Sequence, residues 1–208
     1  MKTPVRTRLL SALLSLVMLV SLLPVSVFAA EPASGTWEKV TEAQEDWSGQ
    51  YLIVYEKGSL IMDGSLSALD KEGNKVDVTI TDGKIVGDYA KYAFTIAPMT
   101  GGWSVQSASG KYISGKSGSN KIITGSTPEL NTITFADGNV KIASNNTTLQ
   151  YNAAATNGTR FRYYKSENQQ PVALYKLSTA PARQSGIVTD LTTLQNGDKV
   201  VVFNPANK

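Results

Sequence analysis

Two arginines and a tyrosine form the pattern in this chain with the clearest chemical meaning. Arg160, Arg162 and Tyr164 occupy every second position of one short segment. A β-strand places these three side chains on one face, and the intervening Phe161 and Tyr163 on the other. Guanidinium groups bind carboxylate, phosphate or sulfate through paired hydrogen bonds. The stripe is therefore a candidate anion site, and the alternative is a solvated face that blocks edge pairing.

A second candidate is a face that binds sugars or polymers. Aromatic rings pack against the apolar faces of sugars, and amides exchange hydrogen bonds with hydroxyl groups. The aromatic candidates are Trp37, Trp47, Trp103, Tyr112, Tyr151, Tyr163 and Tyr164, and the amides are Asn145, Asn146, Gln150 and Asn152. Trp103, Tyr112 and Tyr151 occupy apolar strand positions, which favours the core. Trp47 lies between Asp46 and Ser48, so we expect it to be the exposed aromatic.

Most catalytic chemistry is excluded by composition. The chain contains no histidine and no cysteine, so it cannot form a Ser-His-Asp triad, a Cys-His pair or a His/Cys zinc site. The acidic turns at Asp63, residues 70–74 and Asp82 lack the spacing of an EF-hand. A glycosidase needs two carboxylates about 5–9 Å apart in a cleft, whereas the acids here fall in turns and polar segments. We therefore expect no catalytic residue, no cofactor and no metal site.

The net charge of +3 comes from the N-terminus. Lys2, Arg6 and Arg8 are the charged residues among the first 29, and the remainder holds 17 basic and 17 acidic residues. A neutral, mixed-charge surface offers no electrostatic attraction to nucleic acid or anionic lipid. We therefore expect no nucleic-acid partner.

The N-terminus has the three parts of a secretory signal peptide. A basic start is followed by an apolar run over residues 9–27, and Val27-Phe28-Ala29 is a small-x-small cleavage pattern. We predict a signal peptide over residues 1–29, a flexible mature N-terminus over residues 30–36, and a secreted, extracellular or cell-surface protein without membrane attachment after cleavage. The alternative is a retained membrane anchor, because the apolar run approaches spanning length.

Residues 37–178 predict an all-β module. The sequence shows short alternating apolar segments and no helical periodicity, and turn residues separate these segments, most clearly at Gly101-Gly102 and Asp137-Gly138. Asp82-Gly83, between residues 76–80 and 84–86, predicts a hairpin. About twelve short strands follow from this pattern. A hairpin followed by a further strand recurs about three times, which favours a compact β-trefoil-like barrel. The alternative is a two-sheet β-sandwich.

A longer repeat relates the two ends of the mature chain. Residues 40–56 and 188–204 share Val-Thr, an acid, a glycine at the same offset and an apolar strand. Self-similarity at a fixed period indicates an array of domains. We therefore predict a linker over residues 179–185 and the truncated start of a second, similar module over residues 186–208, in a chain that is monomeric within a larger protein.

The segments 149–152, 160–164 and 170–176 resemble the C-terminal signature of an all-β accessory module of secreted bacterial multidomain hydrolases. Residues 40–54 resemble the start of the same module, and residues 190–207 are similar to N-terminal modules of clostridial 5'-nucleotidase/metallophosphatase-type exoproteins. The resemblance implies an accessory region and not the hydrolase. No catalytic residue can be transferred, because such catalytic parts are rich in histidine.

Together these features predict a secreted, non-catalytic β module at the N-terminus of a larger exoprotein. It would bind an extracellular glycan or a cell-wall polymer, or serve as a spacer. The alternative is the N-terminal fragment of a secreted metallophosphatase/5'-nucleotidase or endonuclease whose catalytic domain lies elsewhere. The candidate ligand-binding residues are Trp47, Asn145, Asn146, Arg160, Arg162 and Tyr164.

Overall fold

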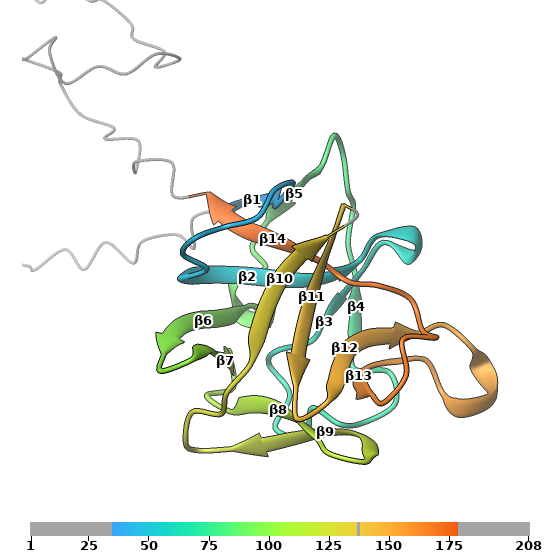
Figure 1. The fold of residues 1–208 in the computed structure, drawn as a ribbon. Coiled ribbons are helices and arrows are strands. Elements are labelled where there is room, and N and C mark those ends of the chain that lie inside the picture. The colour runs from blue at the N-terminus through green and yellow to red at the C-terminus, as the bar shows by residue number, and fades with distance from the viewer. Residues whose placement is uncertain (1–34, 137, 179–208) are drawn as a thin grey trace, which may run out of the picture. The chain divides into compact units, whose positions relative to one another are not determined.

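The computed structural model describes residues 35–136 and 138–178. The predicted signal peptide, linker and second-module start therefore lie outside the described residues, as does most of the predicted flexible segment. Within the described part, the chain forms fourteen β-strands and three short 3₁₀ helices (Figure 1). The prediction of an all-β fold is confirmed. No helix in this part is long and apolar enough to cross a membrane.

The strands form two antiparallel sheets and not a closed barrel, so the predicted compact barrel is not observed in this form. The larger sheet runs, in spatial order, through β5 (Lys84–Gly87), β1 (Gly35–Lys39), β14 (Ala173–Ser178), β2 (Gly49–Tyr55), β6 (Phe94–Met99), β7 (Gly102–Ser107), β8 (Tyr112–Lys116) and β9 (Ser119–Gly125), while β3 (Leu60–Met62) pairs with β2 and with β4 (Lys75–Asp77). The smaller sheet contains β10 (Thr132–Ala136), β11 (Asn139–Ser144), β12 (Thr147–Asn152) and β13 (Arg160–Tyr164). The 3₁₀ helices are η1 (Glu56–Gly58), η2 (Ala90–Tyr92) and η3 (Ala155–Asn157).

Two hydrophobic clusters lie on opposite sides of strand β2. Tyr51 and Ile53 belong to the main core, which joins both sheets through residues such as Phe94 and Phe161. Leu52 and Val54 alternate with them and belong to the second cluster. All four β2 side chains from 51 to 54 are fully buried. This strand is therefore buried on both of its faces.

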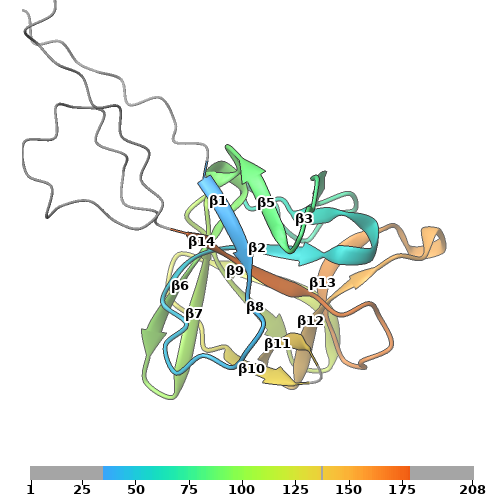
Figure 2. The same cartoon turned by 90° about the horizontal axis from the view of Figure 1, so that it is seen from above.

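Strand β1 begins earlier than the sequence predicts. Gly35 and Thr36, assigned to the flexible mature N-terminus, pair with β5 on one side, and Thr36 pairs with Ser178 of β14 on the other. Figure 2 shows β1 and β14 where the described chain enters and leaves the fold. The pairing partners come from distant parts of the chain, so the local composition of residues 30–36 does not reveal them.

The Asp82-Gly83 dipeptide forms a tight turn but not the predicted hairpin. Thr81 and Lys84 exchange two backbone hydrogen bonds of 2.9 Å across it, and Asp82 and Gly83 both have positive φ, as a type I′ turn requires. The flanking strands nevertheless separate, because β4 pairs with β3 and β5 pairs with β1.

Asn74 joins the β3–β4 loop to strand β13. Its fully buried side chain donates to the carbonyl oxygens of Leu69 (2.7 Å) and Phe161 (2.8 Å), and accepts from the Phe161 N–H (2.8 Å). The amide thus satisfies backbone groups of β13 that would otherwise be buried without partners. This contact fixes the loop that carries Asp70 beside the face of β13 that carries the arginines.

Candidate functional site

Strand β13 alternates as the sequence predicts. Phe161 and Tyr163 are fully buried in the main core, whereas Arg160 and Arg162 are partly exposed on the opposite face. Tyr164 lies on the same face of β13 as the two arginines, but its side chain is only 8% exposed. It is therefore more buried than the predicted outward-facing stripe of Arg160, Arg162 and Tyr164 implies. Burial raises its pKa above the ordinary tyrosine value, and the nearby arginines only partly oppose this effect. Its hydroxyl group therefore remains protonated at neutral pH.

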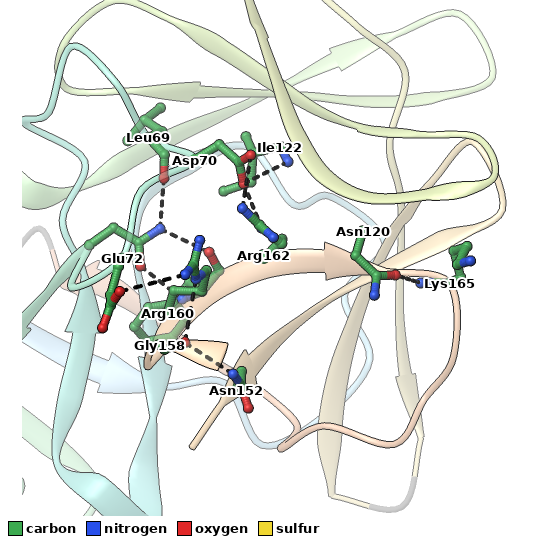
Figure 3. A network of polar contacts seen from close by, with 12 residues as sticks. Leu69, Asp70, Glu72, Asn120, Ile122, Asn152, Gly158, Arg160, Arg162 and Lys165 are labelled. Atoms are coloured by element: carbon green, nitrogen blue, oxygen red, sulfur yellow. Dashed lines mark hydrogen bonds and ion pairs between the residues drawn. The ribbon is translucent and has the colours of Figure 1, made fainter. Parts of the chain in front are cut away.

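Each arginine of β13 lies beside a carboxylate of the β3–β4 loop (Figure 3). Arg162 donates from Nε to Asp70 Oδ1 (2.7 Å) and from Nη2 to Asp70 Oδ2 (3.1 Å). Arg160 lies 3.9 Å from Glu72, and its Nε donates to the Gly158 carbonyl at 3.4 Å. The guanidinium charges are therefore offset within the protein, which disfavours the anion site that the sequence suggests.

A pocket of about 320 Å³ opens over this face of β13. Its lining comes from β9, the end of β12, β13 and the β13–β14 connection, through the residues Asn120, Asn152, Arg162, Tyr164 and Gln169. Three of the five side chains are neutral amides, one is a phenol, and the single charge is paired with Asp70. Such a surface presents hydrogen-bonding groups without a net charge.

The rim of the pocket is held by side-chain to backbone hydrogen bonds. Asn120 Oδ1 accepts from the Lys165 N–H at 2.9 Å, as Figure 3 shows. Gln150 Oε1 accepts from the Gln169 N–H (3.0 Å), and Gln150 Nε2 donates to the Ser166 carbonyl (2.9 Å). Gln150 therefore fixes the connection that carries Gln169.

Asn152 has a structural role among the residues that line the pocket. It is 5% exposed. Its Nδ2 donates to the Gly158 carbonyl (3.0 Å), while its Oδ1 accepts from the Ala154 N–H (3.0 Å). Because both ends of this amide are engaged, Asn152 shapes the pocket and closes the 153–158 loop.

Three lining groups remain available to a ligand. Within the described part of the chain, no hydrogen bond engages the Tyr164 hydroxyl, the Asn120 Nδ2 or the Gln169 side-chain amide. Together with the remaining N–H groups of Arg162, they supply donors, and the Gln169 carbonyl and the Tyr164 hydroxyl supply acceptors.

The expectation that Trp47 is exposed is wrong. Its side chain is 3% exposed and belongs to the main core with Tyr51 and Phe94. The polar neighbours Asp46 and Ser48 form a local turn, in which the Ser48 N–H donates to Asp46 Oδ1 at 2.8 Å. Asp46 stays exposed and Ser48 is half-buried while the indole packs inward, so Trp47 contributes to the core and not to a binding face.

Asn145 and Asn146 form the tight turn between β11 and β12 and do not line the Arg162–Tyr164 pocket. Both have positive φ, 50° and 57°, which asparagine tolerates better than most residues. Asn145 Nδ2 also donates to the Gly115 carbonyl at 2.8 Å. The two residues line a separate recess of about 290 Å³, with Leu130, Thr132, Ala143 and Ser144. The six predicted site residues therefore do not form one site.

Other aromatic and acidic candidates have structural positions. Tyr151 is 2% exposed and stacks on Tyr55 at 4.5 Å between ring centroids, which confirms its place in the core. Trp103 and Tyr112 are half-buried. Asp70, in the acidic turn at residues 70–74, forms an ion pair with Arg162. In residues 35–136 and 138–178, no group of three or more acidic residues lies close enough to hold a metal ion.

Sequence reasoning missed Asn120 and Gln169. Both lie in polar, loop-like surroundings with no motif around them, and only the packing of β9 and the β13–β14 connection around β13 brings them together.

Comparison with known proteins finds no matching family model, no similar curated protein and no similar solved structure. Functional inference for this chain therefore depends on the chemistry of the pocket itself.

Proposed function

We propose that this chain is a secreted, non-catalytic β module that binds an extracellular glycan or cell-wall polymer at the Arg162–Tyr164 pocket. The observation that carries the proposal is the lining of that pocket, in which neutral amides and a protonated phenol surround a charge-paired arginine. Hydrogen-bonding groups of this kind match the hydroxyl groups of a sugar.

The size of the pocket supports a small unit of a larger ligand. Its volume of about 320 Å³ lies at the lower end of the range for ligand pockets. A single sugar ring of a polymer fits this scale, while the rest of the polymer would extend along the surface. The pocket would then recognise a terminal or protruding residue of the polymer.

A binding role fits the residues better than catalysis. The sequence contains no histidine or cysteine to act as a base, a nucleophile or a soft metal ligand. Asp70, which pairs with the pocket residue Arg162, also accepts the Ile122 N–H at 3.2 Å. The oxygen atoms of this carboxylate are therefore engaged within the protein and are not free to act on a ligand.

Binding of the full chain to a panel of polysaccharides tests the proposal. We expect retention by at least one neutral polymer in affinity electrophoresis or isothermal titration calorimetry. Asn120→Ala and Gln169→Ala should each weaken that binding by about threefold to tenfold, because each removes one hydrogen-bonding group. The matched control is Asn168→Ala, since Asn168 is an exposed amide that does not line the pocket.

Two results would contradict the proposal. Absence of binding to every polysaccharide would leave only a spacer role for the module. Binding that survives both pocket substitutions unchanged would place the ligand elsewhere on the surface.

Export is part of the same proposal. The basic start, the apolar run and the small-x-small pattern over residues 1–29 support a signal peptide. N-terminal sequencing of the protein recovered from the culture medium tests this directly, because cleavage after Ala29 or Ala30 would leave a new N-terminus. Retention of residues 1–29 in a membrane fraction would favour the anchor.

For the topology, we propose a β-trefoil-like relationship between three segments. The meanders β6–β7–β8 and β10–β11–β12 and the hairpin β2–β3 coincide with three sequence segments of similar pattern, which are residues 94–113, 135–151 and, more weakly, 51–62. This correspondence supports a three-fold internal repeat that extends over two sheets.

A second proposal concerns a longer protein of which this chain would be the N-terminal region. The repeat of residues 40–56 at 188–204 supports a further module of the same kind. The resemblance to modules of secreted hydrolases suggests a metallophosphatase/5'-nucleotidase or an endonuclease as the catalytic part. Sequencing of the gene beyond codon 208 tests this, and a stop codon there would exclude it.

A further inference from the structure

We propose that the Arg162–Tyr164 pocket selects an uncharged sugar ring over its carboxylated counterpart, and that Asp70 sets this preference. The inference rests on the proposed function and specifies the class of ligand. It follows from the way in which the only charged lining residue, Arg162, is partnered.

Asp70 occupies one of the two edges of the Arg162 guanidinium that offer paired N–H donors to a carboxylate, and it places a negative charge beside the other. A guanidinium binds a carboxylate most strongly through two parallel N–H donors. In this protein the Nε and Nη2 donors are both taken by Asp70, at 2.7 and 3.1 Å. A second carboxylate would find only the remaining N–H groups and would face the Asp70 charge at short range.

Asp70 is held in place from two sides. Its Oδ1 also accepts the Ile122 N–H of β9 at 3.2 Å, and the buried Asn74 fixes the loop that carries it. The side chains of Asp70 and Arg162 are only 19% and 22% exposed. The pair therefore holds the Arg162 guanidinium in a fixed position beside the pocket, and it is not a mobile surface contact that a ligand could easily displace.

The neutral lining groups match a polyol better than an anion. Asn120 Nδ2, the Gln169 amide and the Tyr164 hydroxyl are neutral, and together they include both donors and acceptors. A sugar hydroxyl both donates and accepts, so it can use all three groups. A carboxylate in place of a hydroxyl group can only accept, so that position of the ring can no longer donate to the Gln169 carbonyl.

The substitution Asp70→Asn removes the negative charge of this side chain and keeps its size and shape. Asparagine retains an oxygen that can accept the Ile122 N–H, but it removes the negative charge beside Arg162. The arginine charge is then no longer offset, and the pocket becomes attractive to an anionic sugar. The matched control is Glu72→Gln, which removes a like charge beside Arg160 but does not touch the pocket lining.

The experiment measures binding of the full chain to β-glucan, galactan and mannan, each as the native neutral polymer and after oxidation of C6 to a carboxylate. For the wild type we expect a native polymer to bind at least about tenfold more tightly than its oxidised form, or about 1.4 kcal/mol. Asp70→Asn should reduce this ratio about tenfold, whereas Glu72→Gln should leave it unchanged. Circular dichroism and urea unfolding establish that each variant is folded.

The outcomes distinguish this inference from the proposed function. Equal or tighter binding of an oxidised polymer by the wild type would overturn the inference and leave the glycan-binding proposal standing. An unchanged ratio in folded Asp70→Asn would also overturn it. Binding of no polymer in either form would refute the proposed function, and with it the inference. If Asp70→Asn does not fold, the wild-type ratio alone decides.

Discussion

Asp70 and Arg162 are 92 positions apart in the sequence and are joined by two hydrogen bonds, from Nε to Oδ1 at 2.7 Å and from Nη2 to Oδ2 at 3.1 Å. This ion pair connects the β3–β4 loop to strand β13, and its arginine lines the pocket. It therefore links the stability of the loop to the charge of the candidate site.

Asp70→Ala should destabilise the protein by about 1–2 kcal/mol. The pair is neither fully exposed, where ion pairs contribute less than about 1 kcal/mol, nor fully buried, where loss of one partner costs about 3–5 kcal/mol. Urea unfolding of Asp70→Ala, Arg162→Met and the double variant measures the coupling energy. Additive effects of the two substitutions would contradict a direct contribution of the pair to stability.

Tyr163→Phe and Tyr51→Phe should have opposite effects on stability. The buried Tyr163 hydroxyl donates to Asn131 Oδ1 at 2.6 Å, so its removal leaves a buried acceptor unpaired and should cost about 1–2 kcal/mol. The fully buried Tyr51 hydroxyl has no hydrogen-bond partner in the described structure, so its removal should stabilise by about 1 kcal/mol. Urea unfolding of the two variants measures both effects, and a loss of stability in Tyr51→Phe would show that its hydroxyl has a partner, such as an ordered water.

The protein should lose stability between pH 10 and about 12. Burial raises the pKa of Tyr51 from 10.0 to about 12, and burial also raises the pKa of Tyr163 and of Tyr175. Since the folded state disfavours the phenolate, this contribution is fully present below the unfolded value and is lost as the pH rises through the folded value. Urea unfolding at a series of pH values, with tyrosine absorbance at 295 nm, measures the effect. Tyr51→Phe should decline less steeply, and an ordinary phenol titration in the folded protein would contradict the prediction.

The turn at Asn145 and Asn146 should respond to backbone conformation and not to amide chemistry. Asn146 has a φ of 57°, so Asn146→Ala should cost about 1 kcal/mol, whereas Asn146→Gly should be neutral or slightly stabilising. Thermal unfolding compares the two variants. Neither substitution should alter glycan binding at the Arg162–Tyr164 pocket, and weaker binding in a folded variant would assign a ligand role to this turn.

The sequence predicts local features of this fold well. The hairpin between β10 and β11 follows from Asp137-Gly138, and the alternation of β13 follows from its residue pattern. Both depend on neighbours within a few positions, which hydrophobic period and turn chemistry describe directly.

Features that depend on distant partners could not be predicted in the same way. Asp82-Gly83 forms its turn, but β5 pairs with β1 because β1 offers a free sheet edge. Trp47 is buried by core residues that its polar neighbours do not reveal. The anion site suggested at Arg162 has the same origin. Nothing near Arg162 in the sequence indicates that Asp70 pairs with its guanidinium group.

The pairing of Thr36 with Ser178 determines how the described body would respond to mechanical load. Since β1 and β14 are antiparallel, the chain enters and leaves at the same end of two adjacent strands. Tension applied between these points peels the strands apart one hydrogen bond after another and does not shear many bonds together. A tethered module with this geometry unfolds at low force, because the hydrogen bonds between β1 and β14 break one at a time.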